Sequence, residues 1–109
     1  MRYARKSMDV KTAKCLLVAK VLVADGMMTE NERAFLDEVM EKIGLGPLER
    51  RRVIDLEGWD EAEPVVAKLS IDEKREVIAM IVDAASADGK LSPLEIATVK
   101  RITAALGVD

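Results

Sequence analysis

Four carboxylates at matching positions in two similar stretches are the side chains of this chain best suited to chemistry. Asp25 and Glu32 lie in residues 24–32, and Asp88 and Glu95 lie in residues 87–95. Each aspartate follows an apolar segment with helical periodicity, so it faces the negative end of a helix dipole, which costs about 0.3–1 kcal/mol at an exposed site. Two such aspartates indicate either a binding role or a pair of Asx turns, in which the side chain accepts backbone N–H groups.

A divalent-cation site is the chemistry that these carboxylates would support. Each stretch fits the last eight positions of an EF-hand loop but lacks the acidic residues at positions 1 and 3, so neither alone would bind calcium tightly. If the two stretches lie side by side, their carboxylates converge, and an all-oxygen cluster suits calcium, magnesium or manganese. The predicted ligands are Asp25, Glu32, Asp83, Asp88 and Glu95. Capping and turn roles account for the same residues, and this alternative stays open.

The complete absence of histidine removes most other chemistries. It excludes Ser-His-Asp and Cys-His nucleophiles and His-ligated zinc. The sequence also lacks a phosphate-binding glycine loop, and the single Cys15 lies in an apolar helical run, where it is expected to be a buried hydrophobe. We therefore predict a protein that is not an enzyme; a hydrolase built on carboxylates stays open as an alternative, but nothing in the sequence points to one. The sequence identifies no small-molecule substrate and no cofactor other than a divalent cation.

The two stretches are predicted to be elbows that join pairs of helices. Gly26 and Gly89 suit the left-handed conformation that ends a helix. Three residues later, Thr29 and Ser92 can accept the first N–H groups of a new helix. The glutamates three positions further on, at 32 and 95, complete two capping boxes.

The chain contains an internal repeat with a constant offset of 63 residues, which relates Asp9 to Asp72 and Gly44 to Gly107 as well as the elbows. We predict repeat units over about 7–45 and 70–108 with a connector over 46–69, all within one domain spanning 1–109. Apolar periodicity and capping signals predict helices at about 8–24, 30–43, 47–56, 61–69, 71–87 and 93–106. Ser7 is the expected cap of the first helix, and Asp60 with Glu63 the capping pair of the fourth. One face of the second helix should turn inward: Phe35, Leu36, Val39, Met40 and Ile43.

Composition agrees with a compact, all-α, single-domain bundle of about six helices. Half of the 109 residues are hydrophobic but only 3% are aromatic, so aliphatic side chains must fill the core, which favours helix packing over a sheet. No uncharged apolar run approaches the roughly 18 residues of a membrane span, and residues 7–14 are too polar for a signal peptide. A cytoplasmic location is the corresponding expectation.

Charge is unevenly distributed along the chain. Residues 1–20 contain six basic residues and one acidic residue, whereas residues 21–45 contain two basic and six acidic residues. The first region can attract anions and the second cations, although two solvated helix faces explain the pattern equally well. Nucleic-acid binding is not expected, because the chain is acidic overall and has no aromatic residues interleaved with its basic ones.

The motif Ala-Asp-Gly-x-Met/Leu-Thr/Ser-x-x-Glu, present near both ends of a short helical chain, resembles the TerB-like tellurite-resistance family over about 7–108. The resemblance implies an all-helical fold found in bacterial proteins linked to resistance to tellurite and other stresses. A related domain occurs in a membrane-anchored DnaJ-type co-chaperone, and the family's acidic turn residues have been proposed as a metal-binding patch. Carried over, that patch implicates Asp25, Glu32, Asp88 and Glu95. The position after the glycine, often acidic in the family, holds Met27 and Lys90 here.

Two functions follow from these observations. The first is a non-enzymatic, TerB-like stress-response module that binds a divalent cation or a protein partner through its acidic turns. The resemblance allows this partner to be membrane-associated. The second is a protein-interaction or scaffold domain in which the turns are purely structural. Such a domain could be a homodimer. Residues 50–52, which are all arginine, or the Met27–Met28 pair would contact its partner.

Overall fold

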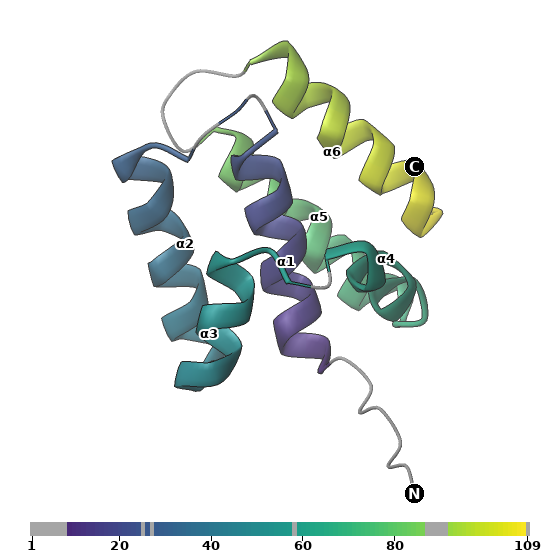
Figure 1. The fold of residues 1–109 in the computed structure, drawn as a ribbon. Helices are drawn as coiled ribbons and strands as arrows, with labels where there is room; N and C mark the ends of the chain where they lie inside the picture. The colour runs from purple at the N-terminus through teal and green to yellow at the C-terminus, as the bar shows by residue number, and fades with distance from the viewer. Residues whose placement is uncertain (1–8, 25, 27, 58, 87–91, 109) are drawn as a thin grey trace, which may run out of the picture.

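The computed structural model describes residues 9–24, 26, 28–57, 59–86 and 92–108. Within these ranges the chain forms six helices and no strand, which confirms the predicted all-α architecture (Figure 1). The helices are α1 (Val10–Leu22), α2 (Glu30–Ile43), α3 (Pro47–Ile54), α4 (Trp59–Ala67), α5 (Ile71–Ala85) and α6 (Pro93–Leu106). None of these helices is both long and apolar enough to cross a membrane.

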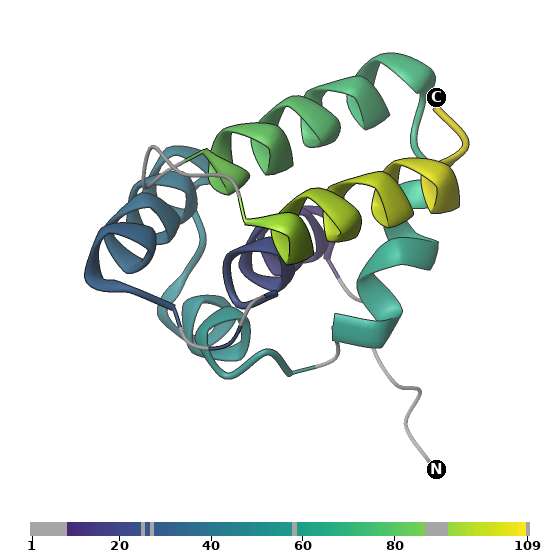
Figure 2. The same cartoon turned by 90° about the horizontal axis from the view of Figure 1, so that it is seen from above.

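Helix α1 is the centre of the fold. It packs against each of the other five helices, most extensively against α4, and Figure 2 shows it enclosed by them. Nine of its thirteen residues are buried, among them Leu16, Leu17 and Leu22. Because α1 is apolar on nearly all sides, burial on all sides is the arrangement that removes most hydrophobic surface from water.

Helices α2 and α6 have the predicted bounds, and these bounds differ by the repeat offset at both ends. Both end at a glycine in the left-handed conformation, with φ 86° at Gly44 and φ 72° at Gly107. The next residue in each case donates its N–H to a carbonyl five positions earlier, as Leu45 does to Met40 over 3.1 Å. This hydrogen bond is the one expected of a glycine-terminated helix.

Helices α1 and α5 are shorter than predicted. The N-cap of α1 is Asp9, whose side chain makes no capping hydrogen bond, so the prediction of Ser7 as the cap is wrong; Ser7 itself lies outside the described residues. At their C-terminal ends, Val23 and Ser86 have nearly identical backbone angles, φ −101° and ψ 9° against φ −99° and ψ 4°. These angles lie in the bridge region, outside the α-helical values, and the two helices end at Leu22 and Ala85.

The connector helices also differ from their predicted bounds. Helix α3 ends at Ile54, because Leu56 takes a left-handed conformation (φ 56°) and the N–H of Glu57 reaches the carbonyl of Arg52 over 2.9 Å. This ending is usual for glycine; here Leu56 accepts the strain and packs against the core. Helix α4 begins at Trp59, so Asp60 lies inside the first turn and is not its N-cap.

One buried polar group has no partner within the described structure. Thr12 is fully buried in α1, and its Oγ1 makes no hydrogen bond there. Leaving a hydroxyl unpaired in an apolar interior costs about 1–3 kcal/mol. The hydroxyl of Thr103, by contrast, donates to the carbonyl of Val99 over 2.7 Å.

We therefore expect Thr12→Val to stabilise the protein by about 1 kcal/mol, since it replaces an unpaired hydroxyl with a methyl group of similar size. Urea unfolding followed by circular dichroism measures the change. Thr103→Val is the matched control and should be neutral or destabilising, because it removes a satisfied hydrogen bond. A lower stability for Thr12→Val would contradict the absence of a partner.

Candidate functional site

Glu32 and Glu95 form capping boxes at the starts of α2 and α6. The N–H of Glu32 donates to Thr29 Oγ1 over 3.2 Å, and Thr29 N–H donates to Glu32 Oε1 over 2.8 Å. The N–H of Glu95 donates to Ser92 Oγ over 3.0 Å, and Ser92 N–H donates to Glu95 Oε1 over 3.2 Å. These reciprocal pairs satisfy N–H groups that a helix start leaves open, and both boxes confirm the prediction from residue spacing.

Both capping glutamates are deeply buried for charged residues. Glu32 is only 4% exposed and Glu95 only 3%. A buried carboxylate requires hydrogen-bond partners, and one oxygen of each side chain already has one in its capping box. Each glutamate therefore has a structural role as a cap. If it also bound a metal ion, it would have to do so while keeping its capping hydrogen bond.

The caps themselves should contribute measurably to stability. We expect Thr29→Ala and Ser92→Ala each to lower the free energy of unfolding by about 1 kcal/mol, because each leaves helix N–H groups unsatisfied. Thr98→Ala is a control from the interior of α6, where the hydroxyl donates to the carbonyl of Leu94 over 2.8 Å and alanine is a good helix former. Equal effects of all three substitutions in urea unfolding would contradict the capping assignment.

The described ends of the two elbows lie on the same side of the molecule. Figure 1 shows the last turns of α1 and α5 and the first turns of α2 and α6 at its top, and Figure 2 looks onto that end. The C-terminal ends of α1 and α5 carry the negative ends of two helix dipoles there, and the N-terminal ends of α2 and α6 carry the positive ends of two others. Asp25 and Asp88, the central residues of the predicted cation site, lie outside the described residues.

The remaining predicted ligand, Asp83, has a different neighbourhood. It is exposed near the end of α5 and faces α2, where it lines a groove together with Phe35, Glu38 and Met80. Across the described ranges, no three acidic or cysteine residues come close enough together to hold a metal ion. The structure therefore places Glu32 and Glu95 in caps and Asp83 in a groove, and does not bring these three into one cluster.

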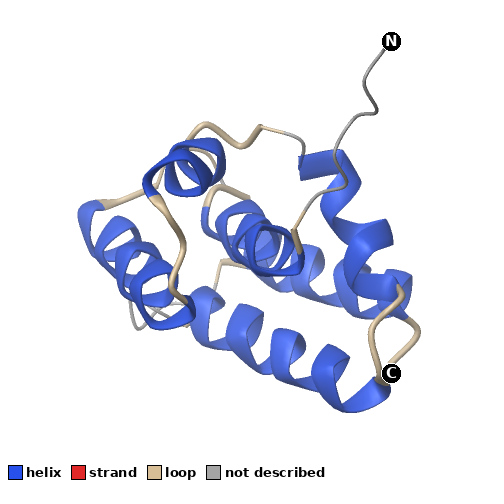
Figure 3. Cartoon of the chain, turned by 90° about the horizontal axis from the view of Figure 1, so that it is seen from below, coloured by secondary structure: helices blue, strands red, loops and turns tan. Residues whose placement is uncertain are grey.

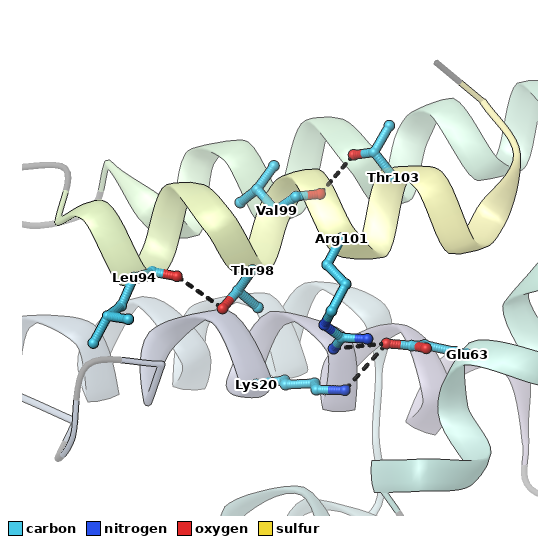
Figure 4. A network of polar contacts seen from close by, with 7 residues as sticks. All are labelled: Lys20, Glu63, Leu94, Thr98, Val99, Arg101 and Thr103. Carbon is cyan, nitrogen blue, oxygen red and sulfur yellow. Dashed lines mark hydrogen bonds and ion pairs between the residues drawn. The ribbon is translucent and has the colours of Figure 1, made fainter.

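A three-residue ion cluster joins helices that are distant in sequence. Glu63 Oε2 lies 3.1 Å from Lys20 Nζ and 3.1 Å from the guanidinium of Arg101, so α4 binds α1 and α6 through one oxygen (Figure 4). The predicted capping of α4 by Asp60 and Glu63 is thus replaced by these ion pairs. Sequence reasoning missed the cluster, although Lys20 inside an apolar helix was a signal that a counter-charge must lie nearby.

The groove between α2 and α5 is the second feature that sequence reasoning missed. Of the α2 residues predicted to face inward, only Leu36 and Met40 are fully buried; Phe35, Val39 and Ile43 are half-buried. The reason is that α2 packs chiefly against α1, while its contact with α5 is small. The groove has a volume of about 170 Å³ and its walls are Phe35, Glu38, Val39, Lys42, Ile43, Met80 and Asp83. Figure 3 shows α2 beside the C-terminal end of α5.

Cys15 is buried in α1, as predicted. Burial raises the pKa of its thiol from 9.0 to about 12, against the opposing effects of Lys14 and Arg50. At neutral pH the side chain is therefore a thiol, whereas the thiolate is the nucleophile and metal ligand. This position carries no cysteine chemistry in the folded state.

We expect iodoacetamide to modify Cys15 at pH 8 only through unfolding, because the thiolate fraction at a pKa of about 12 is roughly one ten-thousandth. Mass spectrometry should detect rapid modification in 6 M urea and almost none without urea. The raised pKa of Cys15 also makes the free energy of unfolding decrease as the pH rises from 9 to 12, because only the unfolded chain loses the thiol proton in this range. Below pH 9 the thiol is protonated in both states, and its effect on stability does not change with pH. Rapid modification without urea would contradict the burial of Cys15.

Comparison with known proteins gives one match. The sequence model of a family described as "Tellurite resistance protein TerB" matches residues 50–109, which is more than half of the chain. The match includes the second elbow but not the first. No curated protein and no solved structure matches the chain.

Proposed function

The chain belongs to the TerB family of tellurite resistance proteins, and from this membership we propose that it is a non-enzymatic cytoplasmic module of a stress or tellurite-resistance response that binds a divalent cation at its elbow end. Asp25 and Asp88 are the principal ligands in this proposal. Glu32 and Glu95 hold the starts of α2 and α6, the helices that follow the two elbows, in place through the capping boxes. Calcium, magnesium and manganese are the candidate ions, since all three prefer oxygen ligands.

The position of the four helix ends is the observation that carries this proposal. The described helix ends that flank both elbows lie on one side of the bundle (Figures 1 and 2), and a site shared by Asp25 and Asp88 requires this arrangement. The dipoles of the two helix C-terminal ends and the two helix N-terminal ends on this side oppose one another, so the attraction for cations comes from acidic side chains, among them Glu30 and Glu32 in the first turn of α2.

Titration with calcium, magnesium and manganese tests the proposal. Backbone NMR should show saturable changes at the amides of Gly26 and Gly89, with manganese broadening the same signals, and Asp25→Asn with Asp88→Asn should abolish them. Glu57→Gln with Glu61→Gln removes the same charge from an exposed site outside the elbows and should leave the titration unchanged. No change at either glycine at millimolar cation would rule out the cation site.

A protein-interaction domain with purely structural turns is the second candidate function. The capping roles and deep burial of Glu32 and Glu95 favour it, because they account for these carboxylates without any ligand. Alanine at both Asp25 and Asp88 separates the two candidates. Reduced stability in a protein that shows no response to cations would support structural turns, whereas loss of a cation response at unchanged stability would support the cation site.

A further inference from the structure

We propose that the groove between α2 and α5 is a docking site for a basic amphipathic helix of another protein. The groove is formed by the apolar residues Phe35, Val39, Ile43 and Met80, with Glu38 and Asp83 as its acidic residues. This inference does not rest on the cation proposal, because the groove contains neither capping glutamate, and the predicted ligand Asp83 lies in it, outside the two elbows.

The apolar part of the groove is a second stripe on α2. Phe35, Val39 and Ile43 recur at intervals of four residues, so they lie on one side of the helix, next to the Leu36 and Met40 stripe that enters the core. All three are half-buried, as is Met80 on α5. Aromatic side chains and methionine are enriched where proteins bind one another, because they provide large and adaptable contact surfaces.

The charges around the groove determine whether a basic or an acidic partner can bind there. Glu38 and Asp83 are exposed, and the adjoining outer face of α2 adds Glu41 as well as Asp37, which is paired with Arg33. Lys42 is the one basic residue lining the groove within the described ranges. This surface attracts lysine and arginine side chains and repels nucleic-acid phosphates and anionic lipids. A basic protein segment is the partner whose charge complements it.

The dimensions of the groove favour a helix over a small molecule. Phe35 and Ile43 are eight residues apart, which is about 12 Å along α2, or slightly more than two helical turns. An amphipathic helix that presents apolar side chains at positions i, i+4 and i+7 spans this length. The groove volume of about 170 Å³ is below the roughly 300–1,000 Å³ of small-molecule sites.

A designed peptide provides the probe. We would use a 16-residue blocked helix of leucine, lysine and alanine, with leucine at i, i+4 and i+7, and follow methyl NMR signals of the protein in EDTA. Two matched peptides carry glutamate in place of lysine, or alanine in place of leucine. Protein variants Glu38→Lys with Asp83→Lys reverse the exposed charges of the groove, and Glu57→Lys with Glu61→Lys make the same change outside α2 and α5.

The proposal predicts saturable shifts at Val39, Ile43 and Met80 with the basic leucine peptide, and much weaker binding of both matched peptides. Reversing Glu38 and Asp83 should weaken binding about tenfold or more, while the control pair should leave it within about twofold. Shifts outside the groove, equal binding of the alanine peptide, or no shift at millimolar peptide would overturn it. Concentration-dependent shifts at the same methyl groups without peptide would identify a second copy as the occupant and would also overturn it.

Discussion

Leu17→Ala is expected to lower the free energy of unfolding by about 3–5 kcal/mol, the range typical of a leucine removed from a close-packed core. Leu17 is fully buried in the middle of α1, and α1 packs against every other helix. The surrounding helices cannot all move inward to fill the space, so the cavity persists. A domain of this size is stable by only about 5–15 kcal/mol in total, so the loss is a large fraction.

Thermal unfolding measures this effect as a decrease in Tm of more than about 12 °C. Leu48→Ala is the matched control, because Leu48 on α3 is 77% exposed and its truncation should change stability by less than about 0.5 kcal/mol. A loss below about 1 kcal/mol for Leu17→Ala would show that α1 is not the central helix.

Glu63→Gln should have the second-largest effect, about 1–3 kcal/mol. The substitution keeps the size of the side chain but removes the negative charge shared by Lys20 and Arg101. The side chains of Lys20 and Glu63 are only 15% and 20% exposed, so water replaces the lost interaction poorly. Arg101 is half-exposed, so water screens its attraction to Glu63. The expected loss of stability is therefore smaller than for a fully buried ion pair.

Asp37→Asn is the control for Glu63→Gln. It breaks the ion pair with Arg33, in which both side chains are about half-exposed, and should change stability by less than about 0.5 kcal/mol. Adding Lys20→Met to the Glu63→Gln variant should restore part of the lost stability, because the partly buried ammonium group that no longer has the carboxylate of Glu63 beside it is then absent. A loss for Glu63→Gln no greater than that for Asp37→Asn would contradict the cluster as a link between helices.

The parts of the fold that were predicted correctly depend on neighbours within a few positions in the chain. The two capping boxes use residues three apart, and the left-handed glycines directly follow the last turns of α2 and α6. The bounds of these two helices could therefore be read from the sequence. The burial of α1 could be read as well, because its residues are apolar on nearly all sides.

The errors occur where local signals compete with contacts between distant segments. Asp60 and Glu63 have the spacing of a capping pair, yet α4 begins at Trp59, one residue before Asp60. Glu63 binds Lys20 and Arg101, which are 43 and 38 positions away. At Leu56 a left-handed backbone ends α3, and the side chain packs against the core. In these cases contacts with distant segments outweigh the local preference. A rule based only on neighbouring residues has no information about such contacts.

The candidate sites divide in the same way. The sequence alone determined that Glu32 and Glu95 begin helices, that Cys15 is buried and that histidine chemistry is absent, because these follow from residue type and short-range spacing. Only the tertiary structure decided that Asp83 faces α2 and that Phe35, Val39 and Ile43 line a groove. The physical reason is that the exposure of a helix face depends on which helix packs beside it and how closely, and here α2 packs on α1 and leaves a gap beside α5.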